Sequence, residues 1–158
     1  MHYKLNTNDT KMNYMRTGYN ELLEFIGEDY QVFGTLSFKH RQTYEQAEKT
    51  LNHFWNCIDR IFYGNASYRK NIKTKRANVI QQGSTRHNTH IHFVAKSVKG
   101  FSTNDFIDIL KYVWETKVRT AGLQQIEEII NAHATSKYLL HEFNLLGSDT
   151  LALSSTNI

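Results

Sequence analysis

The sequence contains almost no cysteine and no long apolar run. Cys57 is the only cysteine, which excludes an internal disulfide and a cysteine-based metal cluster and gives no sign of an oxidising compartment. No apolar stretch approaches the roughly 20 residues that span a bilayer, and the polar start MHYKLNTNDTKMNYMRTGYN lacks the apolar centre of a signal peptide. We therefore expect a cytoplasmic protein with no membrane partner, in which Cys57 packs within a helix.

The size and charge of the chain suit one compact domain with a mildly basic surface. Its 158 residues, 40% of them hydrophobic, are enough to bury a single core. The formal net charge of +4 bears on association with polyanions and not on the fold. The sequence has no phosphate-binding P-loop, so we expect no built-in helicase.

Hydrophobic periodicity and capping signals predict an alternation of strands and helices. Thr43 with Gln46, and Ser102 with Asp105, are typical of helix starts. In chain order, the predicted elements are a helix at 22–26, a strand at 30–38, a helix from 44 to 62, strands at 77–82 and 89–96 joined by the turn GSTRHN, a helix from 103 to 114, an edge strand at 123–130 and a helix at 133–143.

The same periodicity predicts which side chains form the core. The candidates are Ala47, Leu51, Phe54, Trp55, Ile58, Ile61 and Phe62 in the first long helix, Phe106, Ile109, Leu110, Val113 and Trp114 in the second, and Leu123, Ile126 and Ile129 or Ile130 in the edge strand.

This order of elements predicts an α+β fold, a ferredoxin-like or RRM-like sandwich in which helices cover one face of a largely antiparallel sheet. We expect the other face to stay free, as it does in modules that present an open sheet to nucleic acid. We divide the chain into an N-terminal helical extension (1–29), one domain (30–146) and a polar C-terminal tail (147–158).

The segment THIHF carries the first chemical signal. In a strand, His90 and His92 point to one face while Ile91 and Phe93 point to the other. If the apolar pair packs on the helices, both imidazoles stand on the open face, where they can bind one divalent ion. An incidental pair of polar side chains is the alternative.

A basic run follows the first long helix. Between 69 and 76 there is no acid, and Tyr63 and Tyr68 come just before it, a combination that suits a nucleic-acid backbone with bases stacked nearby. The alternative is a solvated loop. The candidate DNA-binding residues of this basic segment are Arg69, Lys70, Lys73, Lys75 and Arg76.

Three motifs in order make the sequence similar to a known family. FGTLSF, THIHF and SKYLLHE resemble the first-strand, His-hydrophobic-His and tyrosine motifs of the HUH endonucleases, particularly the single-tyrosine replication initiators (Rep proteins) of small phages, plasmids and viruses. The intervening FSTNDFIDILKYVW is similar to the segment that links the second and third motifs. The resemblance covers roughly residues 31–142.

The resemblance implies a site for Mg²⁺ or Mn²⁺. The family usually supplies a third ligand, commonly glutamate, from the strand before the histidines, and Gln82 matches that position by spacing. Its carbonyl can coordinate a hard cation but adds no charge. Gln81 lies on the opposite strand face, and because both parities of ANVIQQ contain an apolar residue, the pattern does not choose between them. His87, in the turn, is a lesser candidate.

The resemblance also implies that Tyr138 is the nucleophile. His141, three residues later, shares its helical face and occupies the position where the family often has lysine. Lys137 is the residue that can supply the missing charge. Packing at a helix surface is the ordinary alternative for a tyrosine. Tyr112 is less favoured because it belongs to a core-packing helix.

The function implied is site-specific nicking of single-stranded DNA, at an origin that can be a hairpin, through a covalent 5′-phosphotyrosine that starts rolling-circle replication. A replication helicase of the host, plasmid or phage is the expected partner. A relaxase or single-tyrosine transposase would share the chemistry. The rival from another class is a non-catalytic RRM-like module that binds single-stranded nucleic acid.

Overall fold

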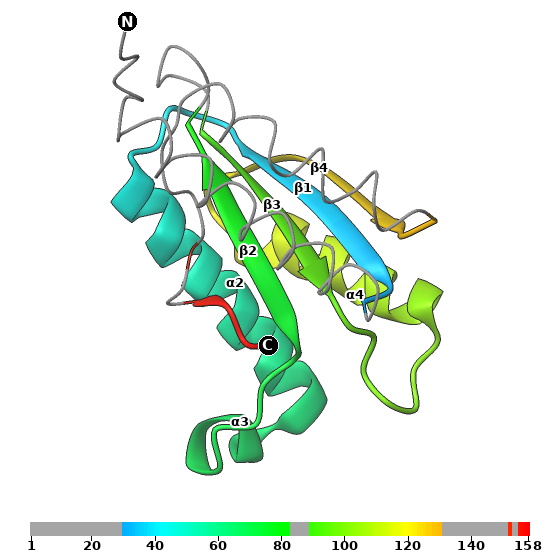
Figure 1. Cartoon of the computed structure of the whole chain (residues 1–158). Coiled ribbons are helices and arrows are strands. Elements are labelled where there is room, and N and C mark those ends of the chain that lie inside the picture. Colours follow the sequence, from blue (N-terminus) through cyan, green and yellow to red (C-terminus); the bar gives the residue numbers. More distant parts are fainter. Residues whose placement is uncertain (1–29, 83–88, 131–151, 153–154) are drawn as a thin grey trace, which may run out of the picture.

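A computed structural model describes residues 30–82, 89–130, 152 and 155–158 (Figure 1). Its elements are β1 (Val32–Phe38), α2 (Tyr44–Tyr63), α3 (Asn65–Arg69), β2 (Arg76–Gln81), β3 (His90–Ala95), α4 (Thr103–Lys117) and β4 (Ala121–Glu128). The predicted helices at 22–26 and 133–143 lie outside the described residues.

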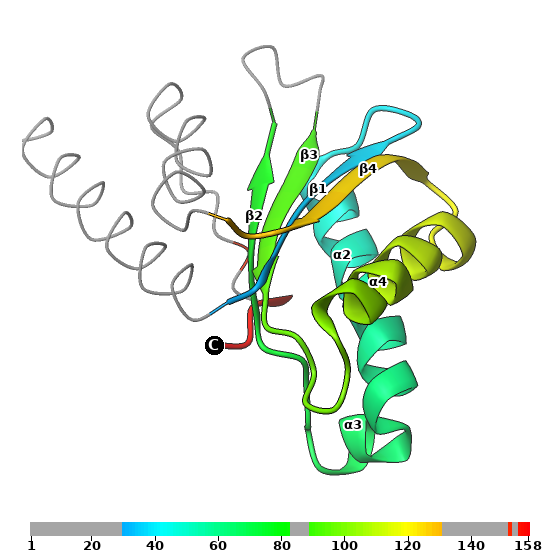
Figure 2. The ribbon, with the colours of Figure 1, turned by 90° about the vertical axis from the view of Figure 1, so that its right-hand side faces the viewer.

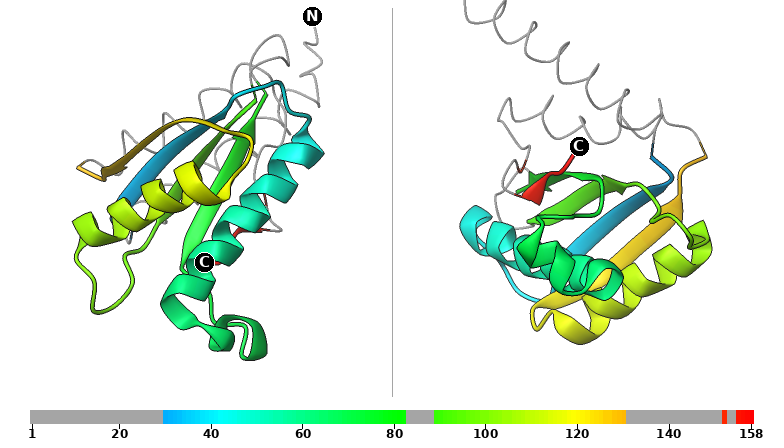
Figure 3. Two further views of the ribbon diagram at one scale, coloured as in Figure 1. Left: turned by 180° about the vertical axis from the view of Figure 1, so that it is seen from behind. Right: turned by 90° about the horizontal axis from the view of Figure 1, so that it is seen from below.

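The four strands form one sheet in the order β2-β3-β1-β4, and all neighbouring strands are antiparallel. Helices α2 and α4 lie together over one face of this sheet (Figures 2 and 3). The prediction of an α+β fold with a largely antiparallel sheet and helices on one face is therefore confirmed.

The central strand β1 shows why the sheet has two different faces. Val32 and Leu36 are fully buried in the core beneath the helices, whereas Thr35 alternates to the other face. Between them, Gly34 is paired with Phe93 of β3, and a Cβ at residue 34 would overlap the Phe93 ring. Glycine at this position lets an aromatic ring lie directly over the strand backbone.

Both long helices begin at the predicted caps. The Thr43 side chain accepts a hydrogen bond from the Gln46 N–H (3.2 Å), and the Thr43 N–H donates to Gln46 Oε1 (2.9 Å). At α4, Ser102 Oγ accepts from the Asp105 N–H (3.0 Å). None of the helices in the described ranges combines the length and the apolar character needed to cross a membrane.

An aromatic cluster joins the two helices to the sheet. The Trp55 and Phe93 ring centroids are 5.3 Å apart, and those of Phe54 and Trp114 are 5.7 Å apart, both edge to face. Most predicted core residues of α2 and α4 are buried here, but Ile61 is 49% exposed because Phe62 is the residue that packs against the core at the end of α2.

The edge strand β4 contributes less to the core than its composition suggests. Ile126 is buried as predicted, but Leu123 is 85% exposed and Ile130 is 99% exposed. A strand alternates its faces every residue, so Leu123 cannot share a face with Ile126, three residues later. The prediction for Leu123 was wrong, and of the alternatives Ile129 and Ile130, the half-buried residue is Ile129.

The last residues of the chain lie against β2. Asn157 and Arg76 exchange two backbone hydrogen bonds of 2.8 and 2.7 Å as an antiparallel bridge. The N–H of Ala152, which is fully buried, donates to the Asn78 carbonyl (2.9 Å). Residues 152 and 155–158 therefore pack on the domain and are not the polar tail that their composition predicts, because their backbone groups pair with the edge strand.

Candidate metal and nucleic-acid site

His90 and His92 lie on the face of the sheet opposite to α2 and α4. Ile91 and Phe93, which alternate with them on β3, belong to the core beneath the helices. In β1, Ser37 pairs with His90 and Thr35 with His92. His90 and His92 therefore share the face of the sheet that the sequence predicts for them.

Gln81 is the β2 residue that meets His90. The two are direct cross-strand partners, and Gln81 Oε1 lies 3.0 Å from His90 Nε2. Gln82 follows the last residue of β2 and has the opposite strand parity. The spacing argument that selected Gln82 as third ligand is corrected by the strand register, which brings Gln81 to the histidines instead.

His92 is held in one orientation by β1. Its Nδ1 lies 2.9 Å from Thr35 Oγ1, and its ring stacks on Phe33 with centroids 5.9 Å apart and an interplanar angle of 10°. When Thr35 accepts the Nδ1 proton, Nε2 becomes the metal-binding nitrogen, because a ligating histidine commonly donates its other N–H to a fixed acceptor. Burial, and then the nearby His90 ring, lowers the pKa of His92 to about 3, so this imidazole is neutral at physiological pH.

The spacing of these groups suits a divalent ion. Ligands in neighbouring positions of an octahedral ion, each bonded at about 2.1 Å, lie about 3.0 Å apart. The Gln81 oxygen and the His90 nitrogen already have this separation, and the two imidazole centroids are 4.8 Å apart. The amide oxygen is a donor that suits Mg²⁺ or Mn²⁺, whereas the two imidazoles are donors more typical of later transition metals, and the set brings no negative charge to the site.

A stronger ligand set is absent from the described ranges. No group of three or more His, Cys, Asp or Glu side chains occurs among residues 30–82, 89–130, 152 and 155–158. Gln81, together with His90 and His92, is the set of metal donors that this part of the sheet offers.

The part of this face that is formed by β2 and the middle of β3 is buried. His92, Val79 and Val94, whose side chains share it, are each 1% exposed. The expectation of a free sheet face was therefore wrong for β2 and β3, whereas on β4 the residues Gln125 and Glu127, which share this face, are exposed. The burial around β2 has a physical reason: β2 carries apolar side chains on both of its faces, and such a strand is covered on both sides.

Arg76 is a structural residue and not a DNA ligand. It is 3% exposed, and its Nη1 donates to both carboxylate oxygens of Asp59, at 3.0 and 2.9 Å. Its guanidinium also lies 4.8 Å from the centre of the Trp55 ring. Burial lowers the pKa of Arg76, and the Asp59 carboxylate opposes that effect. The sequence-based assignment of Arg76 to DNA binding is corrected.

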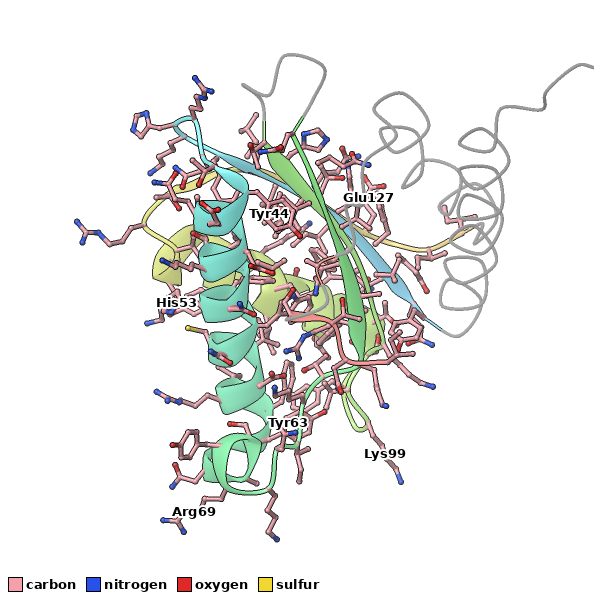
Figure 4. All side chains as sticks on the ribbon, turned by 60° about the vertical axis from the view of Figure 1, so that its left-hand side comes forward. Tyr44, His53, Tyr63, Arg69, Lys99 and Glu127 are labelled. Atoms are coloured by element: carbon pink, nitrogen blue, oxygen red, sulfur yellow. The ribbon has the colours of Figure 1, made fainter. Side chains whose placement is uncertain are left out.

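The rest of the basic segment lies far from the histidines. Lys75 Nζ donates to the carbonyl oxygen of Ile158 (2.6 Å), whereas Arg69 and Lys70 are exposed and Lys73 is half-buried. These residues come before β2 or at its start, whereas Gln81 is its last residue. The five residue steps from Arg76 to Gln81 cover about 17 Å. Arg69 and α3 therefore lie at the opposite end of the sheet from the end of β2 and the start of β3 (Figures 1 and 4).

Tyr138, His141, Lys137 and His87 lie outside the described residues. Tyr112 is described, is 54% exposed and belongs to α4, on the other side of the sheet from the histidines. This position supports the preference for a nucleophile other than Tyr112.

Sequence reasoning did not assign a role to Thr35 and Phe33. The alternation in FGTLSF already placed Thr35 on the polar face of its strand, and the missing information was the register of β1 against β3.

No protein-family model matches the chain, and no curated protein and no solved structure is significantly similar to it.

Proposed function

We propose that this protein is a metal-dependent endonuclease of the HUH type, which nicks single-stranded DNA through Tyr138. The observation that carries the proposal is the convergence of His90, His92 and Gln81 on one sheet face, with the His92 ring fixed by Thr35. The strand order β2-β3-β1-β4 with helices after β1 and β3 supports the finer description of the fold as ferredoxin-like.

The chemistry requires a nucleophile in line with the leaving oxygen. A bound Mg²⁺ or Mn²⁺ would polarise the scissile phosphate. The Tyr138 oxygen attacks phosphorus and forms the new P–O bond, the 3′ oxygen leaves and takes a proton, and the products are a 5′-phosphotyrosine and a free 3′-hydroxyl. His141 and Lys137 assist proton transfer and charge stabilisation. The 3′-hydroxyl can prime rolling-circle synthesis with the help of a replication helicase.

The chain's own residues prepare the metal site. Gln81 and His90 hold their donor atoms at the spacing of neighbouring ligands. Thr35 and Phe33 hold the plane of the His92 ring, and the tautomer that donates Nδ1–H to Thr35 would leave Nε2 for a cation. Relaxases and single-tyrosine transposases would use the same arrangement, and the DNA substrate separates them from replication initiators.

A non-catalytic single-strand-binding module is the second candidate. Such modules stack bases on exposed aromatic side chains of the sheet face. Here Phe33 stacks on a buried histidine instead, and His92 is 1% exposed. This arrangement favours a metal site over a base-stacking platform.

The test is incubation of the full chain with a pool of end-labelled single-stranded and hairpin DNAs, with Mn²⁺ or with a chelator. The proposal predicts a metal-dependent nick and a protein-DNA adduct that resists denaturation. The His90→Ala, His92→Ala double variant should form neither. Tight DNA binding without cleavage under all metal conditions would instead identify the non-catalytic module.

A further inference from the structure

A basic groove lies in the helix layer, where α4 ends beside the first half of α2. Its volume is about 360 Å³. It is lined by Lys49, Thr50 and His53 of α2 and by Lys117, Val118, Arg119 and Thr120 at the end of α4 and after it. Lys49, Lys117 and Arg119 are exposed, and none of the lining residues is acidic.

Helix-end electrostatics explain only part of this charge. A cation in the last turn, such as Lys117, is favoured by the helix dipole. The terminal carbonyl of Lys117 is already an acceptor for His53 Nε2, at 3.0 Å. Lys49 comes from a different helix and Arg119 follows the helix end, so the dipole of α4 does not account for their convergence on one groove.

These cations are not neutralised by ion pairs within the described part of the chain. Among the described residues, the salt bridge is the one between Arg76 and Asp59, which lies toward the other end of α2. The floor of the groove includes Val118, which is 6% exposed. Three positive side chains around a partly apolar floor suit a phosphodiester backbone, which combines spaced negative charges with apolar sugar edges.

The groove opens at the same end of the sheet as His90. Ser37 pairs with His90 and the next residue, Phe38, with Ala121, which directly follows the groove residue Thr120. His90 and Ala121 are thus two inter-strand spacings apart, about 10 Å. A strand of a few nucleotides can span that distance around the end of the sheet.

The loop that connects β1 to α2 lies between the two places. The Lys39 N–H donates to the Thr120 carbonyl (3.1 Å), and Thr89 Oγ1, next to His90, donates to the Gln42 carbonyl (2.7 Å). The loop is therefore fixed both to the groove and to the histidine strand. Its Lys39 and Arg41 are exposed, which continues the positive charge from the groove toward the histidines.

We propose that the basic groove, with Lys39 and Arg41 leading to it, binds the sugar-phosphate backbone of the nucleic-acid strand that flanks the cleaved phosphate. The proposal rests on the proposed function for the identity of that strand. It assigns the strand a path around the end of the sheet into the helix layer, separate from the contact that is predicted for the basic segment at α3. Figure 4 labels the groove residue His53, midway along α2, and Arg69, in α3 beyond the end of α2.

The test measures binding of a fluorescent 20-nucleotide oligo(dT) without divalent ions at several salt concentrations. The triple variant Lys49→Gln, Lys117→Gln, Arg119→Gln should bind at least about tenfold more weakly. The slope of log affinity against log salt should become shallower by about 2, because three phosphate contacts at ~0.7 each are lost.

The matched control removes three positive charges elsewhere. Arg60→Gln, Lys99→Gln, Lys111→Gln lowers the net charge equally but leaves the groove intact, and Lys99 lies toward the α3 end (Figure 4). It should keep nearly the wild-type salt slope. Thermal unfolding of both variants must match wild type, and if the groove triple unfolds early, the single variant Arg119→Gln is measured in its place.

Equal losses of affinity and slope in the two variants, or no loss in the groove variant, would overturn the proposal. Binding to oligo(dT) requires neither metal nor Tyr138, so the outcome is independent of cleavage. If the protein never forms a DNA adduct but the groove variant loses DNA binding, the proposed nuclease function is refuted and the proposed role of the groove in binding is kept.

Discussion

Gln81 Oε1 lies 3.0 Å from His90 Nε2, across the neighbouring strands β2 and β3. In the proposed metal site, this separation would suit both the metal-free and the metal-bound state. Without a cation it is a hydrogen bond, in which the imidazole donates to the amide oxygen. When Nε2 gives up its proton, both atoms present lone pairs at the spacing of neighbouring metal ligands. In the proposed metal site, the register of β2 against β3 would therefore decide which glutamine contacts the cation.

The first prediction separates Gln81 from Gln82. Gln81→Ala should reduce Mn²⁺ affinity by about tenfold or more, as losses of groups that support a metal site do. Gln82→Ala is the matched control, since it removes the same side chain one residue later, and it should have little effect. Isothermal titration with Mn²⁺ measures both. Equal effects of the two variants would contradict the register argument.

The second prediction adds the charge that the site lacks. Gln81→Glu should strengthen Mn²⁺ binding by roughly tenfold, about 1.4 kcal/mol, because a carboxylate contributes a negative charge to the cation. Without metal the variant should unfold at a lower temperature, since the carboxylate would be buried. A parallel loss of stability with no gain in Mn²⁺ affinity would show that residue 81 does not face a cation.

The third prediction concerns the support of His92. Thr35→Val keeps the shape of the side chain but removes the hydroxyl that lies 2.9 Å from Nδ1. We expect a stability loss of about 1–3 kcal/mol from the unpaired buried nitrogen. Mn²⁺ affinity should fall by about 10- to 100-fold. Thr35→Ser, which retains the hydroxyl, should restore most of both in urea unfolding and metal titration.

The fourth prediction distinguishes Arg76 from its exposed neighbours. Arg76→Met leaves the buried Asp59 carboxylate without its partner and should cost about 3–5 kcal/mol in the free energy of unfolding. Lys70→Gln, on exposed surface, should change it by less than about 0.5 kcal/mol. Urea unfolding measures both, and an unaffected Arg76→Met protein would contradict the buried ion pair.

The fifth prediction concerns what remains of the basic segment. Lys70→Gln with Lys73→Gln should weaken binding of single-stranded DNA and reduce its salt dependence. The rate of nicking at saturating DNA should not change, because these residues precede β2, whose length of about 17 Å separates its first residue from Gln81. A slower nicking rate at saturation would place the segment in the reaction itself.

Local patterns in the sequence predict the elements well. The caps at Thr43 and Ser102 and the strand alternation around His90 and His92 depend on neighbouring residues only, and each is found as predicted. The α+β class, with helices on one face of a largely antiparallel sheet, then follows from the order of these elements along the chain.

Long-range pairing could not be predicted in the same way. Whether Gln81 or Gln82 meets His90 depends on the register between two strands, and the burial of Arg76 depends on Asp59, 17 residues earlier. The attachment of residues 155–158 to β2 has no local signal at all, because their small polar side chains are typical of tails. The sequence does not predict the basic groove, because its cations come from separate parts of the chain.

Peptide mapping of the DNA adduct tests the central claim most directly. Wild-type protein, Tyr138→Phe and Tyr112→Phe are incubated with a cleaved single-stranded DNA and Mn²⁺, and the DNA-linked peptide is sequenced by mass spectrometry. The account predicts DNA on Tyr138 in wild type and in Tyr112→Phe, and neither nick nor adduct in Tyr138→Phe, which loses only the attacking oxygen. DNA attached to any other residue, or efficient cleavage by Tyr138→Phe, would contradict it.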